Sequence, residues 1–142
     1  MSDETLQRVF DAIDADRETA ITTLQELVSI PSVTGNEGAV QDQVEKLFRE
    51  RGLEIDRWEA RREDIQNHLE HVGEQDRYEG RPNVVGIQGG NNNGRSILLN
   101  AHMDTVDPGD PSFWTYDPYS GHVEGDLLYG RGSCDMKGGL VT

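Results

Sequence analysis

The sequence predicts an α/β fold in which a mixed, largely parallel sheet is flanked by helices. Apolar residues recur with the helical period near the start of the chain, at Leu6, Val9, Phe10 and Ile13. Short apolar runs that are typical of strands follow later, among them Ile97-Leu98-Leu99 within residues 96–100. Because helical and strand patterns alternate along the chain, helices packed on a sheet are the expected architecture.

Two helical regions are expected before the first strand. Residues 4–29 read as helix, but the apolar pattern falters at residues 14–16, so one bent helix or two short helices would fit. Pro31 ends this region. A second helix is predicted over residues 37–51, with a capping box between Thr34 and Glu37 at its start.

The strand patterns differ in their expected burial. Residues 53–58 alternate between apolar and polar side chains, which predicts a half-exposed strand, and residues 83–87 form a second strand. Residues 96–100 are apolar on both faces and are predicted to form a central strand. A small hairpin is expected over residues 122–129, and a helix is expected to begin at Ser133.

The chain is strongly acidic. Its 142 residues suffice for one modest domain, and 27 acidic against 13 basic side chains give a formal net charge of −14. Nucleic acid is disfavoured as a partner, because phosphate contacts need clustered Lys and Arg. Most carboxylates are expected on a solvated surface, and adaptation to a salt-rich cytoplasm is an open alternative, since salt screens their mutual repulsion.

Composition also predicts a cytoplasmic location. Cys134 is the single cysteine, so no internal disulfide can form, which fits a reducing compartment. The acidic N-terminus has no apolar region typical of a secretory signal. No apolar run approaches the length of about 20 residues that a membrane span needs, so no membrane partner is expected.

The predicted central strand runs into the most informative pattern of the chain, His102-Met103-Asp104. An imidazole at the carboxyl end of a strand lies where open α/β sheets bind ligands. Asp104 is placed to hold the second ring nitrogen of His102 and fix its tautomer. Asp135, between glycines at 132 and 138, offers a second carboxylate. One imidazole with acidic oxygens suits zinc or a similar divalent ion.

The chain resembles, over nearly its whole length, the amidohydrolase and peptidase family that includes acetylornithine deacetylase, succinyl-diaminopimelate desuccinylase, aminoacylase-1 and glutamate carboxypeptidase. Several separate motifs carry the resemblance in the same order and spacing. They lie at residues 30–35, 81–86, 102–106, 117–121 and 128–139, together with Trp114 and Gly125. The segment 81–86 is most similar to the deacetylase and desuccinylase group.

The resemblance implies a hydrolase that uses one or two Zn²⁺ ions, with Co²⁺ as a possible substitute, to cleave the amide bond of small N-acyl amino acids or peptide-like substrates. His102 matches the family's first metal ligand, and Asp135 matches the carboxylate that bridges both metals. Asp104 matches the catalytic-site carboxylate that orients His102. A cis peptide bond is expected between Asp135 and Met136.

The resemblance also implies parts that this chain does not contain. Family members have a Glu-Glu pair, of which one Glu is the general base, a further acidic ligand and a distal His ligand, all later than Thr142. Residues 1–142 are therefore expected to be the N-terminal part of a catalytic domain without the lid domain that makes the parent protein a homodimer. Alone, this segment is expected to be inactive. The alternative is a non-catalytic remnant or binding module with a partial metal site.

Three other features favour structural roles. The segment 130–135 is superficially similar to a dinucleotide-binding loop, but Asp135 stands where that fingerprint has its third glycine. Cys134 is expected to be a small buried residue beside Asp135 rather than a nucleophile or ligand. Trp114, Tyr116 and Tyr119 are expected to pack around the loop that follows Asp104.

Overall fold

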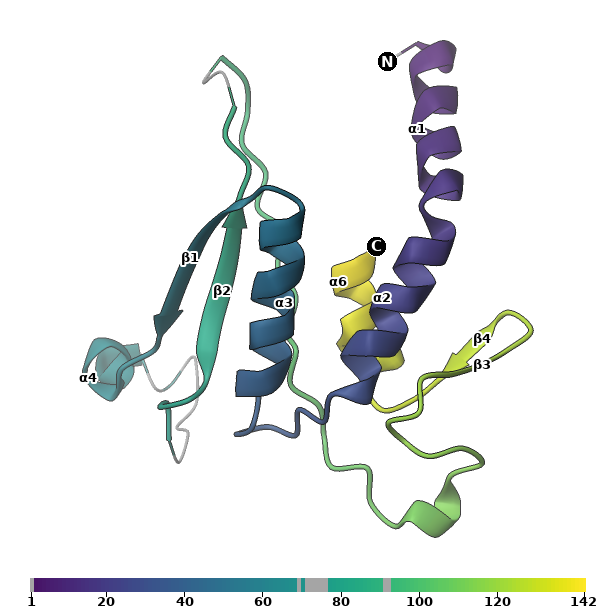
Figure 1. Ribbon diagram of the computed structural model, residues 1–142. Helices are drawn as coiled ribbons and strands as arrows, with labels where there is room; N and C mark the ends of the chain where they lie inside the picture. The colour runs from purple at the N-terminus through teal and green to yellow at the C-terminus, as the bar shows by residue number, and fades with distance from the viewer. Residues whose placement is uncertain (1, 69, 71–76, 91–92) are drawn as a thin grey trace.

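The computed structural model describes residues 2–68, 70, 77–90 and 93–142. Helices and short strands alternate along the chain (Figure 1). The helices are α1 (Asp3–Ala15), α2 (Arg17–Ser29), α3 (Gly38–Glu50), α4 (Arg62–Ile65) and α6 (Gly138–Val141). The strands are β1 (Glu54–Glu59), β2 (Pro82–Ile87), β3 (His122–Glu124) and β4 (Leu127–Tyr129). Short helical turns lie at η1 (Gln66–His68), η2 (Pro111–Phe113) and η3 (Ser133–Lys137).

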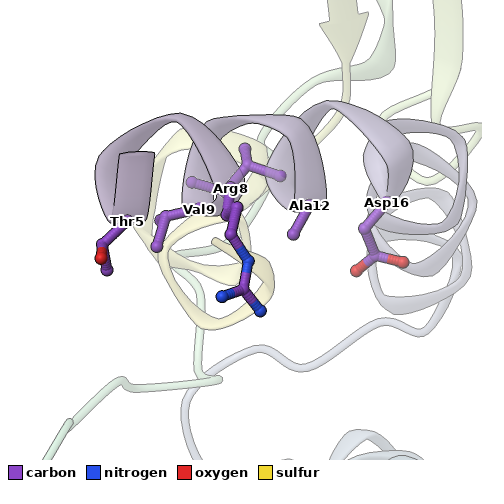
Figure 2. Close-up of a pocket in the computed structure, with 6 residues that line it drawn as sticks. Thr5, Arg8, Val9, Ala12 and Asp16 are labelled. Atoms are coloured by element: carbon purple, nitrogen blue, oxygen red, sulfur yellow. The ribbon is translucent and has the colours of Figure 1, made fainter. Parts of the chain in front are cut away.

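The first helical region is two helices that meet at Asp16. Ser2 caps α1 by accepting a hydrogen bond from the Thr5 N–H at 3.3 Å. None of the α1 residues is buried, whereas α2 buries three, Thr23, Leu27 and Val28. A pocket lies along the exposed surface of α1 (Figure 2) and is lined only by residues 5–16. It is a groove on one helix and contains none of the predicted site residues.

The core forms where α2 and α3 meet the segment that contains Met103. Its buried members are Leu27, Val40, Val44, Leu47 and Met103. On its outer side α3 packs against the antiparallel pair of β1 and β2. These buried side chains have the helical spacing that the sequence predicts for α3, since Val40, Val44 and Leu47 are four and three residues apart.

The α/β class is confirmed, but the predicted largely parallel sheet is not. The strands of the described residues form two separate antiparallel pairs, β1 with β2 and β3 with β4. A parallel contact occurs as an isolated bridge between Val33 and Thr105. The expected strand at residues 96–100 is not formed, and Ile97, Leu98 and Leu99 are each more than 80% exposed. A strand exists only by pairing with a neighbour, and no other described segment pairs with this one.

The last predicted helix begins later than expected. Asp135 and Met136 have backbone angles outside the helical region, so the regular helix α6 starts at Gly138 instead of Ser133. The peptide bond between Asp135 and Met136 is cis, as the family resemblance predicts.

The predicted capping box between Thr34 and Glu37 is wrong. Glu37 is only 6% exposed and makes no side-chain cap to α3. Its carboxylate instead accepts two hydrogen bonds from the Arg81 guanidinium, at 2.8 and 2.9 Å, and one from the Gly35 N–H at 2.8 Å. The pair ties the start of α3 to the segment before β2. Arg81 is a better partner than the helix end because its bond to the carboxylate is bidentate and charge-assisted.

Among the described residues, none of the helices has both the length and the apolar character that crossing a membrane requires.

We expect the Glu37–Arg81 pair to make stability depend on pH. Burial alone would raise the pKa of Glu37, but the hydrogen bonds from Arg81 and the Gly35 N–H lower it below its usual value. A lowered folded-state pKa stabilises the fold at neutral pH, and this contribution is lost as the pH falls through that pKa. Glu37→Gln should therefore cost roughly 3 kcal/mol in urea unfolding at pH 7 and a smaller amount at pH 3, below the ordinary pKa of a Glu side chain. Exposed Glu18→Gln is the control, and an equal cost at both pH values would contradict the prediction.

We also expect the apolar run at residues 97–99 to cause self-association. Its three side chains are 83–84% exposed and contiguous, and exposed apolar patches of this kind promote contacts between molecules. In sedimentation velocity at increasing protein concentration, Leu98→Asn should reduce the share of larger species. Phe113→Asn removes an equally exposed side chain, 88%, from η2 and should have no such effect. If both variants behave alike, the run is not the contact surface.

Candidate functional site

Backbone hydrogen bonds hold the segment at residues 102–105 in place. The Thr105 N–H donates to the Ser32 carbonyl at 2.9 Å, and the Thr34 N–H donates to the Thr105 carbonyl at 3.0 Å. The buried hydroxyl of Ser32 donates to the Met103 carbonyl at 2.7 Å. The segment is therefore fixed on both sides of Asp104 by the connection between α2 and α3.

His102 lies between two carboxylates. Its Nδ1 is 3.1 Å from Oδ1 of Asp104 and 3.1 Å from the backbone carbonyl of the same residue. Its Nε2 is 2.9 Å from Oδ1 of Asp135. Partial burial would lower the pKa of His102, but the hydrogen bond to Asp135 and the contacts with Asp104 outweigh it, so the pKa is raised. The structure thus brings together the three residues that the sequence singles out.

A tight turn presents Asp135 to His102. Gly132 precedes the turn with a φ of +83°, and a side chain there would meet the Thr105 methyl group at 2.5 Å. Asp135 itself is extended, with φ −128° and ψ 97°, and its side chain is 86% exposed. The turn approaches the site segment closely because position 132 has no side chain.

Lys137 anchors this turn from behind. Its side chain is fully buried, and its Nζ donates to the carbonyls of Leu27 and Ile30 at 2.8 Å each. These carbonyls lie at the end of α2, where backbone acceptors lack helical partners and the helix dipole favours a cation. Burial lowers the pKa of Lys137 to about 8. The residue two positions after Asp135 is thereby tied to the helix that precedes Ser32.

The donor atoms fit part of a divalent metal site. An imidazole nitrogen and a carboxylate oxygen face each other at 2.9 Å, and both are ligands that zinc accepts. The other ring nitrogen already has a carboxylate partner, as metal-binding histidines usually do. The part of the chain that the structure describes holds no group of three or more His, Cys, Asp or Glu side chains suited to a metal. The described residues thus bring together two side chains of types that zinc binds, fewer than the four ligands that a zinc ion usually takes.

Two of the aromatic residues after Asp104, Trp114 and Tyr116, pack locally, as expected. Trp114 donates from Nε1 to the Pro108 carbonyl at 2.9 Å, and the Arg131 guanidinium lies 5.0 Å from its ring centre. Tyr116 stacks on His122 with ring centres 3.8 Å apart. These contacts order the loop that precedes the turn of Asp135.

Sequence reasoning misjudged one neighbour of the site and missed others. Cys134 is exposed, so the expectation of a buried position is wrong. Thr34, whose hydroxyl donates to Oδ2 of Asp104 at 2.8 Å, was assigned to a helix cap. Lys137 carried no local signal of its role, because its partners lie 110 and 107 residues away in the chain.

Comparison with known proteins finds one family and several related enzymes. The sequence model described as Peptidase family M20/M25/M40 matches residues 98–142. Succinyl-diaminopimelate desuccinylase 2 of Ruegeria sp. (strain TM1040) is 33% identical over 117 residues, 82% of this chain and 25% of that protein. The succinyl-diaminopimelate desuccinylase of Nitrobacter hamburgensis is 34% identical over 125 residues, 86% and 28% of the two chains. That of Blochmanniella pennsylvanica is 53% identical over 47 residues, 33% and 12%.

We expect Asp135 to control the protonation of His102. Replacing its charge by a neutral amide in Asp135→Asn removes an electrostatic partner of the imidazolium, so the pKa of His102 should fall. An NMR titration of the histidine ring protons measures this directly. Asp126→Asn in the turn between β3 and β4 should leave the titration unchanged. A His102 pKa that is the same in all three proteins would contradict the geometry.

Proposed function

Because this chain belongs to peptidase family M20/M25/M40, we propose that it forms the N-terminal part of the catalytic domain of a metal-dependent hydrolase. The chain spans about a quarter of the length of the curated relatives it matches, 25% and 28% in the two longest matches described above. The proposed reaction is cleavage of the amide bond of an N-acyl amino acid or a similar small amide. The lid domain and the homodimer of the parent protein are part of the same proposal.

The contact between His102 and Asp135 carries this proposal. Two side chains that are 33 residues apart meet at 2.9 Å, and both lie in the part of the chain that matches the family. We assign His102 and Asp135 as metal ligands and Asp104 as the carboxylate that orients His102. When bound, a Zn²⁺ or Co²⁺ ion would polarise the carbonyl of the substrate amide and lower the pKa of a bound water.

The proposed substrate class rests on the relatives. They are named as desuccinylases of succinyl-diaminopimelate, so an N-succinyl amino acid is the first substrate to test. N-acetylornithine is the second, since the resemblance extends to deacetylases. Within the proposal, residues of this chain orient the imidazole of His102 by holding its second ring nitrogen. The general base and the remaining metal ligands come from outside residues 1–142.

One observation favours a second candidate for the isolated chain. Because the described residues contain no group of three potential ligands, the chain alone would bind a metal weakly. It would then act as a binding module with a partial metal site and no turnover.

Both candidates predict no turnover by residues 1–142, so activity of a longer protein separates them. Residues 1–142 should not hydrolyse N-succinyl-diaminopimelate even with added Zn²⁺, because a missing general base alone costs about 10²–10⁴-fold in rate. A polypeptide from the reading frame extended beyond Thr142, loaded with Zn²⁺ or Co²⁺, should hydrolyse it or N-acetylornithine. In that longer protein Asp135→Ala should abolish turnover, whereas Asp126→Ala should not.

Two results would contradict the proposal. Chelator-sensitive hydrolysis by residues 1–142 alone would mean that the residues needed are misassigned. Full activity of Asp135→Ala in the longer protein would remove Asp135 from the site.

A further inference from the structure

The two oxygens of the Asp104 carboxylate have different partners. Oδ1 lies 3.1 Å from Nδ1 of His102, which is also 3.1 Å from the backbone carbonyl of Asp104, and Oδ2 accepts a hydrogen bond from the Thr34 hydroxyl at 2.8 Å. A carboxylate with one partner can rotate about its χ2 bond, which is a broad torsion. When each oxygen has a partner, the two partners together fix the plane of the carboxylate. The hydroxyl of Thr34 is therefore part of what directs Oδ1 to the imidazole.

Thr34 is exposed, so its own position must be fixed by the backbone. Its N–H donates to the Thr105 carbonyl at 3.0 Å, one residue after Asp104. Its hydroxyl is 3.5 Å from the same carbonyl and 2.8 Å from the carboxylate, and a hydroxyl has a single proton to donate. The shorter and charge-assisted bond to Asp104 takes that proton.

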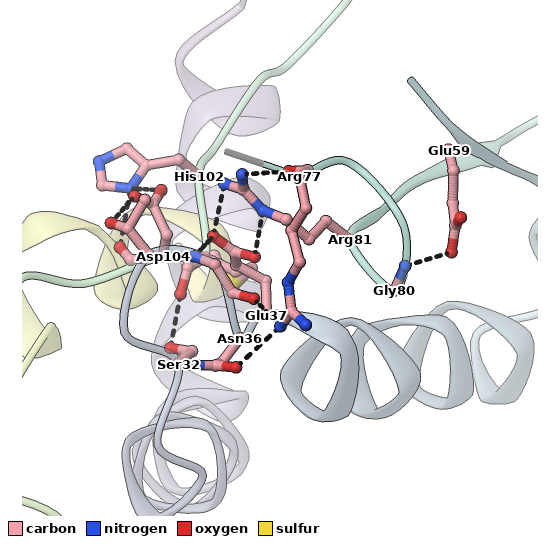
Figure 3. A network of polar contacts seen from close by, with 12 residues as sticks. Ser32, Asn36, Glu37, Glu59, Arg77, Gly80, Arg81, His102 and Asp104 are labelled. Atoms are coloured by element: carbon pink, nitrogen blue, oxygen red, sulfur yellow. Dashed lines mark hydrogen bonds and ion pairs between the residues drawn. The ribbon is translucent and has the colours of Figure 1, made fainter. Parts of the chain in front are cut away.

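The loop after Thr34 is clamped on its other side (Figure 3). The Gly35 N–H donates to Glu37, whose carboxylate is buried against Arg81. The Arg77 guanidinium donates to the Gly35 carbonyl at 2.6 Å and to Oδ1 of Asn36 at 3.0 Å. Gly35 has a φ of +101°, a conformation that favours glycine and turns the chain sharply between Thr34 and the clamp.

These contacts form one path from the Glu37–Arg81 pair to the imidazole. We propose that Thr34 is a positioning residue of the site, which orients Asp104 toward His102, and that the Glu37–Arg81 pair holds Thr34 in place. The inference rests on the proposed function only in naming His102 as a metal ligand. The orientation of Asp104 is a property of the metal-free chain and is tested there.

The first measurement is the tautomer of His102 by ¹⁵N NMR in the metal-free chain, at a pH where the ring is neutral. Nε2 of the ring faces Asp135 at 2.9 Å, so the two tautomers compete, and an oriented Asp104 carboxylate raises the share of the form with the proton on Nδ1. The unmodified chain and Thr34→Ser, which keeps the hydroxyl, should show the same share of the Nδ1–H form. Thr34→Val, which has nearly the same shape but no hydroxyl, should lower that share, and Glu37→Gln should shift it in the same direction.

The second measurement is Zn²⁺ affinity in the same four proteins by titration with a competing chelator. Thr34→Val should bind Zn²⁺ roughly fivefold more weakly than the unmodified chain, the effect of losing one hydrogen bond of ordinary strength. Thr34→Ser should bind it equally well. Amide spectra of each protein report whether it is folded, and Thr34→Ala, which also lacks the hydroxyl, replaces Thr34→Val if that variant is unfolded.

The outcomes separate this inference from the proposed function. An unchanged His102 tautomer in folded Thr34→Val or Thr34→Ala overturns the positioning role, whatever the metal affinity. A shifted tautomer in a chain that binds no Zn²⁺ upholds the positioning role and counts against the metal site. A shift that Thr34→Ser shows to the same extent also overturns the inference, because the hydroxyl is then not responsible.

Discussion

The backbone pairing between residues 32–34 and 103–105 is the contact on which the site depends. It joins two segments about seventy residues apart and is reinforced by the buried hydroxyl of Ser32. The connection between α2 and α3 serves as one partner, so the packing of those helices sets where His102 and Asp104 lie. Burial of Met103 in the same core adds an apolar anchor between His102 and Asp104. Non-directional burial brings the segments together, and directional hydrogen bonds fix their alignment.

Two buried ionisable side chains secure the site from opposite sides. Glu37 holds the loop before α3, and Lys137 holds the turn of Asp135 against the end of α2. Each group would be costly to bury alone. Glu37 is compensated by a guanidinium and a backbone N–H, whereas Lys137 is compensated by helix-terminal carbonyls that need a donor. The chemistry-bearing residues thus lie at an exposed surface, and the groups that fix them lie beneath it.

Local sequence patterns predicted the elements whose formation depends mainly on residues near them in the chain. The buried faces of α2 and α3, the strands β1 and β2, and the β3–β4 hairpin follow from periodicity and turn residues. The prediction of a capping box was wrong because Glu37 has a stronger partner, Arg81, 44 residues away in the chain. The prediction of a strand at residues 96–100 was wrong because a strand needs a neighbouring strand to pair with, and apolar content does not reveal whether one is present. Cys134 was misplaced because the turn around Asp135 departs from the helix that the sequence suggested.

The burial of Lys137 has a consequence for amine chemistry. The chain has two lysines, and Lys46 lies on α3 with 63% of its side chain exposed, whereas Lys137 has no exposed surface. An acylating reagent therefore reaches Lys46 and the N-terminal amine of the folded chain and reaches Lys137 only when the turn separates from α2. The rate at which acyl label appears on Lys137, measured by mass spectrometry, therefore reports how often the turn separates from α2. This measurement needs neither a ligand nor an engineered probe.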